Sequence, residues 1–369
     1  TPGDIVNLTI PTPTYRHRRT SATTARLAKR SKTRSDICMA ITLKDVAERA
    51  GVSRAAVSRT FTPGASVSAK TRAKVEKVAT ELGYSPNILA RSLMTRKTQL
   101  VGLVSNNFHN PVFLEIFDLF TRGLQEKSLR PLLFNLSNET SPKRSLNLMQ
   151  QYSVDGVIIA SSHVPDGFAA AFQVAGMPVV HAFGRAAQTP VVPVVGIDNI
   201  DAGRMAARTL IERGYRHIGF LGGPHDASTT QDRQQGFTEV AALSGVEATV
   251  SFAGAYSFNA GRAEMSRLLR ESRADAYFCA DDVLSIGALS AIRDKGLSVP
   301  RDIGVIGLND MELASWAGID LTTIQQPFGA IIDASIDMIH SQFSNHNRLP
   351  EARLFPCRII ERSTLRPKP

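Results

Sequence analysis

The residues best suited to contact a polyanion lie in one stretch, Leu43–Thr60, which reads LKDVAERAGVSRAAVSRT. Small or apolar side chains recur where two crossing helices would touch, and Gly51 falls between them, where a positive φ favours a residue without a Cβ. The outward side chains of the second helix are short or cationic: Ser53, Arg54, Ala55, Ser58 and Arg59. Such side chains suit base edges and phosphates, so the stretch predicts a helix–turn–helix that enters a DNA major groove. An ordinary surface helical hairpin is the alternative.

A second group of polar side chains follows four predicted strands, at the point where each strand ends. They are Ser105-Asn106-Asn107, Ser161-Ser162, Asp281-Asp282 and Asn309-Asp310. A single loop Asn or Asp is often only a turn former. Because the carboxyl ends of parallel strands meet at one edge of a sheet, several together predict a cleft for a polar small molecule.

The sequence offers little that resembles a catalytic centre. Asp281-Asp282 is a possible acid/base pair, but without a nucleophile or metal ligand nearby, a binding role or a helix N-cap is favoured. No P-loop, GxGxxG after a strand, GxSxG or HExxH is present. Cys38, Cys279 and Cys357 are far apart, which argues against a zinc site or disulfide framework and fits a reducing cytoplasm. We therefore expect no enzyme, no metal and no cofactor.

Positive charge is concentrated in the first quarter of the chain. Residues 1–38 carry a net charge of +6 and residues 39–97 of +7, whereas residues 98–369 carry −3. This step favours a polyanion as the partner of the N-terminal part alone. No apolar run approaches the ~20 residues of a membrane span, and no secretory signal is evident.

Residues 1–38 are rich in Thr, Ser and Arg, lack a helical period, and are expected to be a disordered basic leader. The segment that begins at Met39 resembles a native start, so an over-extended reading frame is the simpler explanation of the leader. An organellar transit peptide is an alternative. A helix capped by Ser68 and ended by Gly83 should complete a DNA-binding domain over 39–85. Residues 86–97 predict a hinge helix and linker too short to be stable alone.

From Gln99 onward, apolar strands alternate with helical patterns, which predicts parallel, doubly wound sheets. The predicted strands are Leu100–Val104, Leu132–Phe134, Gly156–Ala160, Val179–His181, His217–Leu221, Ala276–Cys279 and Ile303–Gly307. The predicted helices are Phe113–Lys127, Ala202–Arg213, Arg233–Leu243, Asn259–Arg270 and Val283–Lys295. The count suggests an α/β core over 98–369 with two lobes, one up to about residue 197 and the other up to about residue 325. The segment Thr322–Ile339 is expected to return to the first lobe.

Several segments together resemble the lactose-repressor/galactose-repressor family of bacterial transcription factors. They include TLKDVAERAGVSRAAVSR, VSAKTRAKVEKVATELGYSPNILARSL, RQQGF at Arg233–Phe237, FCADD at Phe278–Asp282 and LTTIQQP at Leu321–Pro327. The resemblance runs from about Ile41 to Leu365. It implies an all-α headpiece joined to a two-lobed core like a periplasmic sugar-binding protein.

The resemblance also implies roles for residues in the DNA-binding part. Arg54, Ala55 and Arg59 fall where the family reads bases. Leu93 matches the hinge leucine that wedges into the minor groove and kinks the duplex. Positions that match phosphate contacts are Thr42, Leu43, Ser53, Ser58, Ser68, Thr71, Tyr84 and Asn87.

In the cleft, Arg233 matches the arginine that holds effector oxygens. The other predicted effector-binding residues are Asn107, Phe113, Asp281, Asn309 and Gln326. The chain departs from many members at two of these positions, with Asn309 where they carry Asp and Asp281 where they carry Asn. These departures leave the effector open, with a sugar or sugar acid favoured.

The sequence therefore predicts a cytoplasmic, homodimeric transcriptional repressor that binds a pseudo-palindromic double-stranded DNA operator under control of a small-molecule effector. An activator or dual regulator of the same family is the alternative. A transporter's solute-binding protein is opposed by Leu43–Thr60 and the absence of an evident signal peptide, and an enzyme by the absent motifs.

Overall fold

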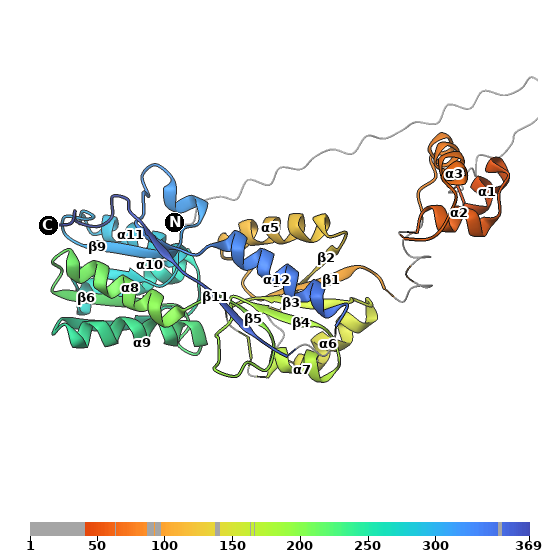
Figure 1. Cartoon of the computed structure of the whole chain (residues 1–369). Coiled ribbons are helices and arrows are strands. Elements are labelled where there is room, and N and C mark those ends of the chain that lie inside the picture. The colour runs from red at the N-terminus through yellow and green to blue at the C-terminus, as the bar shows by residue number, and fades with distance from the viewer. Residues whose placement is uncertain are drawn as a thin grey trace, which may run out of the picture. The chain divides into compact units, whose positions relative to one another are not determined.

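The chain forms two units that divide after Pro86 (Figure 1). The structure, a computed structural model, describes residues 41–62, 64–86, 92, 97–136, 141–162, 164–165, 167–345 and 349–369. The leader over 1–38 and nearly all of the expected hinge helix fall outside these residues.

The first unit is a bundle of three helices, α1 (Leu43–Ala50), α2 (Arg54–Thr60) and α3 (Ala69–Leu82). Its buried core consists of small and β-branched side chains: Val46, Ala47, Ala50, Val57, Val75, Val78 and Ala79. Small side chains let short helices approach closely enough to bury one core. Gly51 and Gly83 end α1 and α3 with φ of 58° and 67°, as the sequence predicts.

The second unit contains two six-stranded sheets, one in each lobe. The N-terminal lobe has the strand order β11-β5-β4-β3-β1-β2. Its strands are all parallel: β1 (Leu100–Ser105), β2 (Arg130–Asn135), β3 (Gly156–Ala160), β4 (Val179–Ala182), β5 (Val194–Ile197) and β11 (Ala352–Phe355).

The C-terminal lobe has the order β12-β10-β9-β8-β6-β7, and only its edge strand β12 runs antiparallel to its neighbour. Its strands are β6 (His217–Gly222), β7 (Glu247–Phe252), β8 (Ala276–Cys279), β9 (Gly304–Asn309), β10 (Thr323–Gln325) and β12 (Arg358–Ile360). The predicted doubly wound parallel sheets are therefore confirmed.

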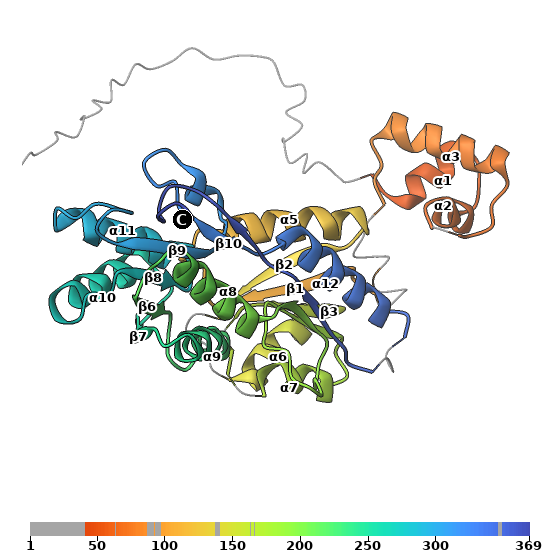
Figure 2. The ribbon, with the colours of Figure 1, turned by 60° about the vertical axis from the view of Figure 1, so that its left-hand side comes forward.

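Helices cover both faces of each sheet, so the central strands are buried on both sides (Figures 1 and 2). In the N-terminal lobe α5 (Val112–Glu126) and α12 (Phe328–Gln342) pack together, opposite α6 (Pro142–Gln151) and α7 (Phe168–Val174). In the C-terminal lobe α8 (Asn199–Glu212) packs on α9 (Ser228–Leu243), and α10 (Phe258–Glu271) on α11 (Asp282–Asp294). A short 3₁₀ helix, η1 (Glu312–Ser315), follows β9.

The chain crosses between the lobes three times. It leaves the first sheet after β5, at Ile197, returns between β10 and α12, and crosses again between β11 and β12. The predicted lobe changes near residues 197 and 325 match the first two crossings. The third crossing, near the C-terminus, is not anticipated by the sequence analysis.

One predicted boundary is wrong in a way that affects the site. The sequence analysis starts a helix at Arg233, but α9 begins at Ser228. Thr229 and Thr230 are polar and β-branched and suggest a loop, yet both side chains are fully buried, and tertiary packing overrides their weak helix propensity. Arg233 therefore lies within the second turn of a helix.

Candidate functional site

Two hydroxyl side chains fix the ends of α1 and α2. Thr42 and Asp45 form a capping box, in which Thr42 Oγ1 accepts from Asp45 N–H and Asp45 Oδ2 accepts from Thr42 N–H. Ser53 Oγ accepts from the N–H of Ala56 at 3.2 Å and so starts α2 directly after the turn at Gly51. The angle and register of α2 thus follow from local sequence signals.

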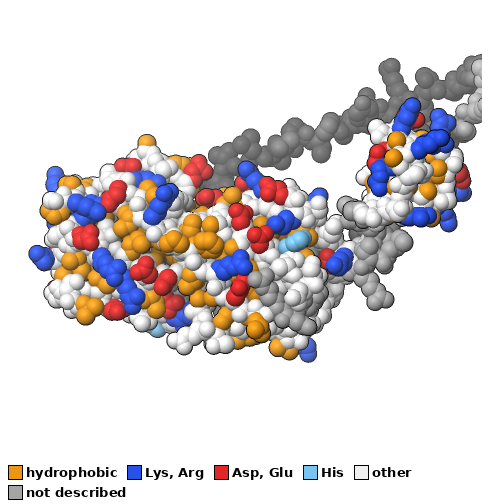
Figure 3. Space-filling model, in the orientation of Figure 1, with side chains coloured by type: hydrophobic (Ala, Val, Ile, Leu, Met, Phe, Trp, Pro, Cys, Tyr) orange, Lys and Arg blue, Asp and Glu red, His pale blue; other side chains and the backbone are white. Residues whose placement is uncertain are grey.

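The free face of α2 has the chemistry of a recognition helix. Ser53, Arg54, Ala55 and Arg59 are exposed and Ser58 is half-buried. Lys and Arg side chains spread over the face of this unit seen in Figure 3. An exposed helix with two guanidinium groups and no bulky side chain can enter the major groove.

The remaining residues predicted to contact DNA also have structural partners. Ser68 caps α3 by accepting from Thr71 N–H, and the two hydroxyls lie 2.8 Å apart. Tyr84 packs against Phe61 with ring centroids 5.8 Å apart, and burial raises the pKa of its phenol. Leu43 is half-buried against the helical core. Asn87 and Leu93 lie outside the described residues.

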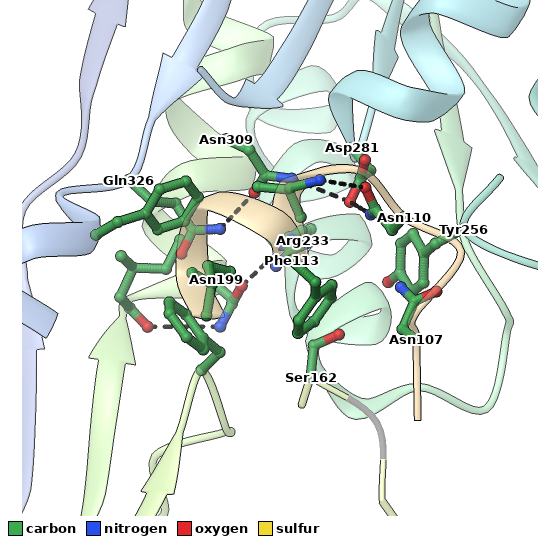
Figure 4. Close-up of a pocket in the computed structure, with 15 residues that line it drawn as sticks. Asn107, Asn110, Phe113, Ser162, Asn199, Arg233, Tyr256, Asp281, Asn309 and Gln326 are labelled. Atoms are coloured by element: carbon green, nitrogen blue, oxygen red, sulfur yellow. Dashed lines mark hydrogen bonds between the residues drawn. The ribbon is translucent and has the colours of Figure 1, made fainter. Parts of the chain in front are cut away.

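A cavity lies between the two lobes of the second unit, with about 500 Å³ of space not filled by atoms, part of which is open to solvent (Figure 4). All six residues predicted to bind an effector line it: Asn107, Phe113, Arg233, Asp281, Asn309 and Gln326. Ligand binding by them stays a prediction. The cavity is also lined by Ser162, one of the strand-end residues from which the cleft is predicted, and by residues that the sequence analysis misses: Asn110, Val112, Ile116, Phe183, Ile197, Asn199, Tyr256 and Phe328.

Arg233 is held from two sides in the wall of this cavity. Its Nε donates to Asn199 Oδ1 at 2.8 Å and its Nη1 donates to the carbonyl of Ala280 at 2.9 Å. Its side chain is only 5% exposed, and the nearby acids Asp232 and Glu239 pair with other arginines, Arg185 and Arg204. Within the described part of the chain Nη2 has no hydrogen-bond partner, which leaves that edge of the guanidinium for a ligand oxygen.

A chain of hydrogen bonds runs across the C-terminal side of the cavity (Figure 4). Asp281 Oδ2 accepts from Asn110 Nδ2 at 2.9 Å and from Asn309 Nδ2 at 3.0 Å. Asn309 Oδ1 in turn accepts from Gln326 Nε2 at 2.7 Å. Burial raises the pKa of Asp281 to about 6. Asn110 comes from the N-terminal lobe, so this network bridges the lobes.

The backbone at the end of β9 is held in an unusual conformation. Asn309 and Asp310 have φ of 133° and 60°, in the region that L side chains rarely adopt. Asp310 is fixed by Arg362 Nη2 at 2.6 Å and by Gln325 Nε2 at 2.7 Å. These contacts hold the strained turn that presents the Asn309 amide to the cavity.

Asp281 and Asp282 do not work as a pair. Asp281 Oδ1 accepts from Val283 N–H at 2.8 Å and caps α11, which confirms the predicted N-cap. Asp282 is fully buried and accepts from Thr323 Oγ1 at 2.6 Å and Met311 N–H at 2.9 Å. Burial raises its pKa to about 7. Each carboxylate is thus bound by its own donors.

Aromatic rings form the apolar part of the cavity wall. Phe113, Phe183, Phe328 and Tyr256 line it together with the amides. Among the missed residues, Asn110 lies in the loop after β1, beyond the residues named at that strand end. Phe183 directly follows β4 and Phe328 begins α12, with their rings 5.9 Å apart, and both are missed because the strand-end rule considers only polar side chains.

No three His, Cys, Asp or Glu side chains in the described part of the chain come together in a way that could hold a metal ion. Of the helices in the described ranges, none has the length and apolar character needed to span a membrane.

Both units of the chain match family models of known proteins. Residues 42–87 match the family model "Bacterial regulatory proteins, lacI family", and residues 207–365 match "Periplasmic binding protein-like domain". The chain is 32% identical over 330 residues to the HTH-type transcriptional repressor PurR of Escherichia coli O1:K1, covering 88% of this chain and 96% of PurR. The chain therefore belongs to the lacI family.

Further relatives extend this likeness. The HTH-type transcriptional regulator CelR of Thermobifida fusca is 35% identical over 296 residues, covering 78% of this chain and 87% of that protein. A Lac repressor dimer bound to operator and the anti-inducer ONPF has a TM-score of 0.78 at 27% identity, covering 88% of this chain and 99% of that one. This member of the lacI family is a DNA-binding transcriptional regulator, as its sequence predicts.

Proposed function

We propose that this lacI-family regulator is a repressor whose affinity for its operator is set by a polar small molecule bound between its two lobes. The observation that carries the proposal is the cavity itself, in which Arg233 turns an unused edge toward a space lined by Asn107, Asp281 and Asn309. The exposed face of α2 supplies the DNA-reading surface.

The lining of the cavity favours a sugar or sugar acid as the effector. Amide side chains bond hydroxyl groups as donors and acceptors, and aromatic rings cover the apolar faces of a sugar ring. Arg233 suits a carboxylate or paired hydroxyl oxygens. A solved relative is described as a "transcriptional regulator CelR-cellobiose complex", with a TM-score of 0.66 and 30% identity, over 88% of this chain and 99% of that one.

We propose that the protein acts as a homodimer on a pseudo-palindromic operator, because a two-fold dimer presents its recognition helices to two half-sites. Leu114 and Trp316 are 77% and 53% exposed, one in each lobe. Hydrophobic side chains also gather along the middle of the face in Figure 3, over the segments that cross between the lobes. Exposed apolar surface of this kind supports association with a second copy.

We further propose that the protein is cytoplasmic and not an enzyme. Its two buried carboxylates, Asp281 and Asp282, each accept hydrogen bonds from groups that hold the fold. A regulator of this family needs only to bind DNA and a ligand, and both needs are met by the residues described above.

Two measurements with the whole protein test the proposal. A gel-shift assay should show tighter binding to a pseudo-palindromic duplex selected from a random pool than to an unselected duplex of equal length. A thermal-shift screen of sugars and sugar acids should find a ligand that raises the melting temperature, since a ligand at 100 times its Kd stabilises by ~2.7 kcal/mol. A ligand that stabilises the core but leaves operator affinity unchanged would contradict effector control.

A further inference from the structure

The start of α9 lies against the N-terminal lobe as well as against the cavity. Thr229 Oγ1 donates to the carbonyl of Ser162 at 3.4 Å, across the gap between the lobes. Arg233, one turn later, lines the cavity. Asp232, which lies between them in sequence, binds an arginine of the N-terminal lobe outside the cavity. The first two turns of α9 therefore carry both a ligand-facing side chain and interlobe contacts.

The partner of Asp232 is Arg185, which follows β4 in the N-terminal lobe. Arg185 Nε donates to Asp232 Oδ2 at 2.9 Å, and its Nη2 donates to Asp232 Oδ1 and, at 3.1 Å, to the carbonyl of Ser228. The contact is bidentate, with geometry that Lys could not reproduce. Of the two side chains, Arg185 is 43% exposed and Asp232 12% exposed, so water reaches one side of the pair.

Neither member of this pair lines the cavity, although Phe183 and Arg233, their neighbours in sequence, do. We propose that the ion pair between Arg185 and Asp232 is an interlobe latch, which sets the fraction of molecules whose lobes are closed and whose effector site is assembled. The inference rests on the proposed function only in taking this cavity as the effector site. The latch itself contacts no effector.

Closure matters for the site because its two walls belong to different lobes. Asn110 and Phe113 come from the N-terminal lobe, whereas Asp281 and Arg233 come from the C-terminal lobe. A ligand that needs both walls binds only closed molecules, so its apparent Kd rises as the closed fraction falls. A partly exposed ion pair is weak enough to open reversibly and is screened by salt, as a latch requires.

The latch can be tested on the full-length protein without an effector. Spin labels at Val174→Cys in α7 and Leu243→Cys in α9 report the separation of the lobes, because both residues are exposed and lie in different lobes. The helices α7 and α9 lie on the same side of the two lobes in Figures 1 and 2. Cys38→Ser and Cys357→Ser remove competing thiols, and Cys279 is buried.

Pulsed electron–electron double resonance should then show a larger fraction of molecules with a long distance between the two spin labels when the latch is broken. We expect Arg185→Gln and Asp232→Asn each to raise the open fraction roughly threefold, the effect of losing one partly exposed ion pair. The double variant should open no further than Arg185→Gln alone, since Arg185→Gln already removes both the ion pair and the bond to the Ser228 carbonyl. Raising the salt concentration should open the unmodified pair but not the variants.

A matched control is Arg204→Gln, which breaks an ion pair of similar exposure between α8 and α9 within one lobe. It should leave the separation unchanged. Separations equal to those of the unmodified protein in both latch variants, or an equal shift in Arg204→Gln, would overturn the proposal, provided that melting curves show each variant folded. A failure to bind any operator would instead count against the proposed function and would not alter these separations.

Discussion

Arg54 and Arg59 carry the two guanidinium groups on the exposed face of α2. Arg59 Nε donates to the carbonyl of Ala55 at 3.4 Å, a long bond that is easily given up for a base edge. If both arginines read bases, alanine at either position should cost ~1–3 kcal/mol on the operator and relax sequence preference. Competition binding against a pool of operator variants measures both effects.

The control for this prediction is Arg301→Ala, which also removes one positive charge, but from the surface of the second unit. There Arg301 is exposed and lies 3.5 Å from Asp302. It should leave operator affinity unchanged. Equal losses on operator and on unselected DNA in the α2 variants would show that the arginines contact phosphate only.

Arg233→Ala should abolish the effector response while operator binding without effector survives. The substitution removes the unused Nη2 edge and two bonds, to Asn199 and to Ala280, that hold the cavity wall. A small loss of melting temperature is therefore expected as well, since each lost bond contributes ~1 kcal/mol. Titration of effector into the variant–operator complex tests the prediction. A dose–response curve that overlays that of the unmodified protein would show that Arg233 does not bind the effector.

Between α8 and α9, two glycines set how closely the helices approach. A Cβ on Gly236 would lie 1.9 Å from the carbonyl oxygen of Ile200, and one on Gly203 would lie 2.1 Å from that of Arg233. Gly236→Ala should therefore destabilise the core by ~1–3 kcal/mol or more, because backbone atoms must move. Gly329→Ala in α12 meets no atom within 4 Å and should be neutral or stabilising by up to ~1 kcal/mol.

Urea unfolding of both glycine variants gives the two free energies of unfolding. Since Gly203 contacts the backbone of Arg233, Gly203→Ala should also weaken effector binding, whereas Gly329→Ala should not. An unchanged free energy of unfolding in Gly236→Ala would mean that the helices separate at no cost.

Most elements of the core can be predicted from sequence because their apolar runs are buried on both faces. All seven predicted strands and all five predicted helices of the core are present. The missed strands have weaker signals: β5 (Val194–Ile197) follows two prolines, β7 (Glu247–Phe252) is a polar edge strand, β11 is an edge strand of four residues, and β10 and β12 have three residues each. Short strands of this kind form because a sheet edge is already present.

The cleft residues are predictable where they follow strand ends or match a family motif, as Asn309 and Arg233 do. The contacts that hold them are not. The ion pair between Arg185 and Asp232 joins residues 47 apart in sequence, and the bond between Asn110 and Asp281 joins residues 171 apart. No local pattern encodes such pairs, because they exist only once the two sheets face each other.

At the scale of the whole molecule, two buried carboxyl groups make stability depend on pH. Burial raises the pKa of Asp281 to about 6 and that of Asp282 to about 7, from 3.8. The folded protein therefore binds protons more tightly than the unfolded chain, and this stabilisation is complete below about pH 4. It is lost as pH rises through the folded pKa values, so unfolding of the core should become easier by a few kcal/mol up to about pH 7.

Chemical denaturation of the core at several pH values between about 4 and 8 measures this dependence. Asp282→Asn should remove most of the dependence of the unfolding free energy on pH, because the amide does not titrate. The variant also loses one of the two acceptors for Thr323 and Met311. Asp302→Asn is the control, since the pKa of this half-buried carboxyl is lowered, so it is ionised in both the folded and the unfolded protein over this range, and its loss should leave the slope unchanged. A stability that rises with pH in the unmodified protein would contradict the assignment.

The third crossing of the chain has a consequence for how the protein is made. Strand β11 pairs with β5 at one edge of the first sheet, and β12, which begins at Arg358, pairs with β10 at the edge of the second. A chain synthesised only as far as Gln342 therefore lacks an edge strand in both sheets, with β5 and β10 each unpaired on one side. Since β11 ends at Phe355 and β12 begins at Arg358, the two sheets gain these strands at nearly the same stage of synthesis, and the lobes cannot finish folding one after the other.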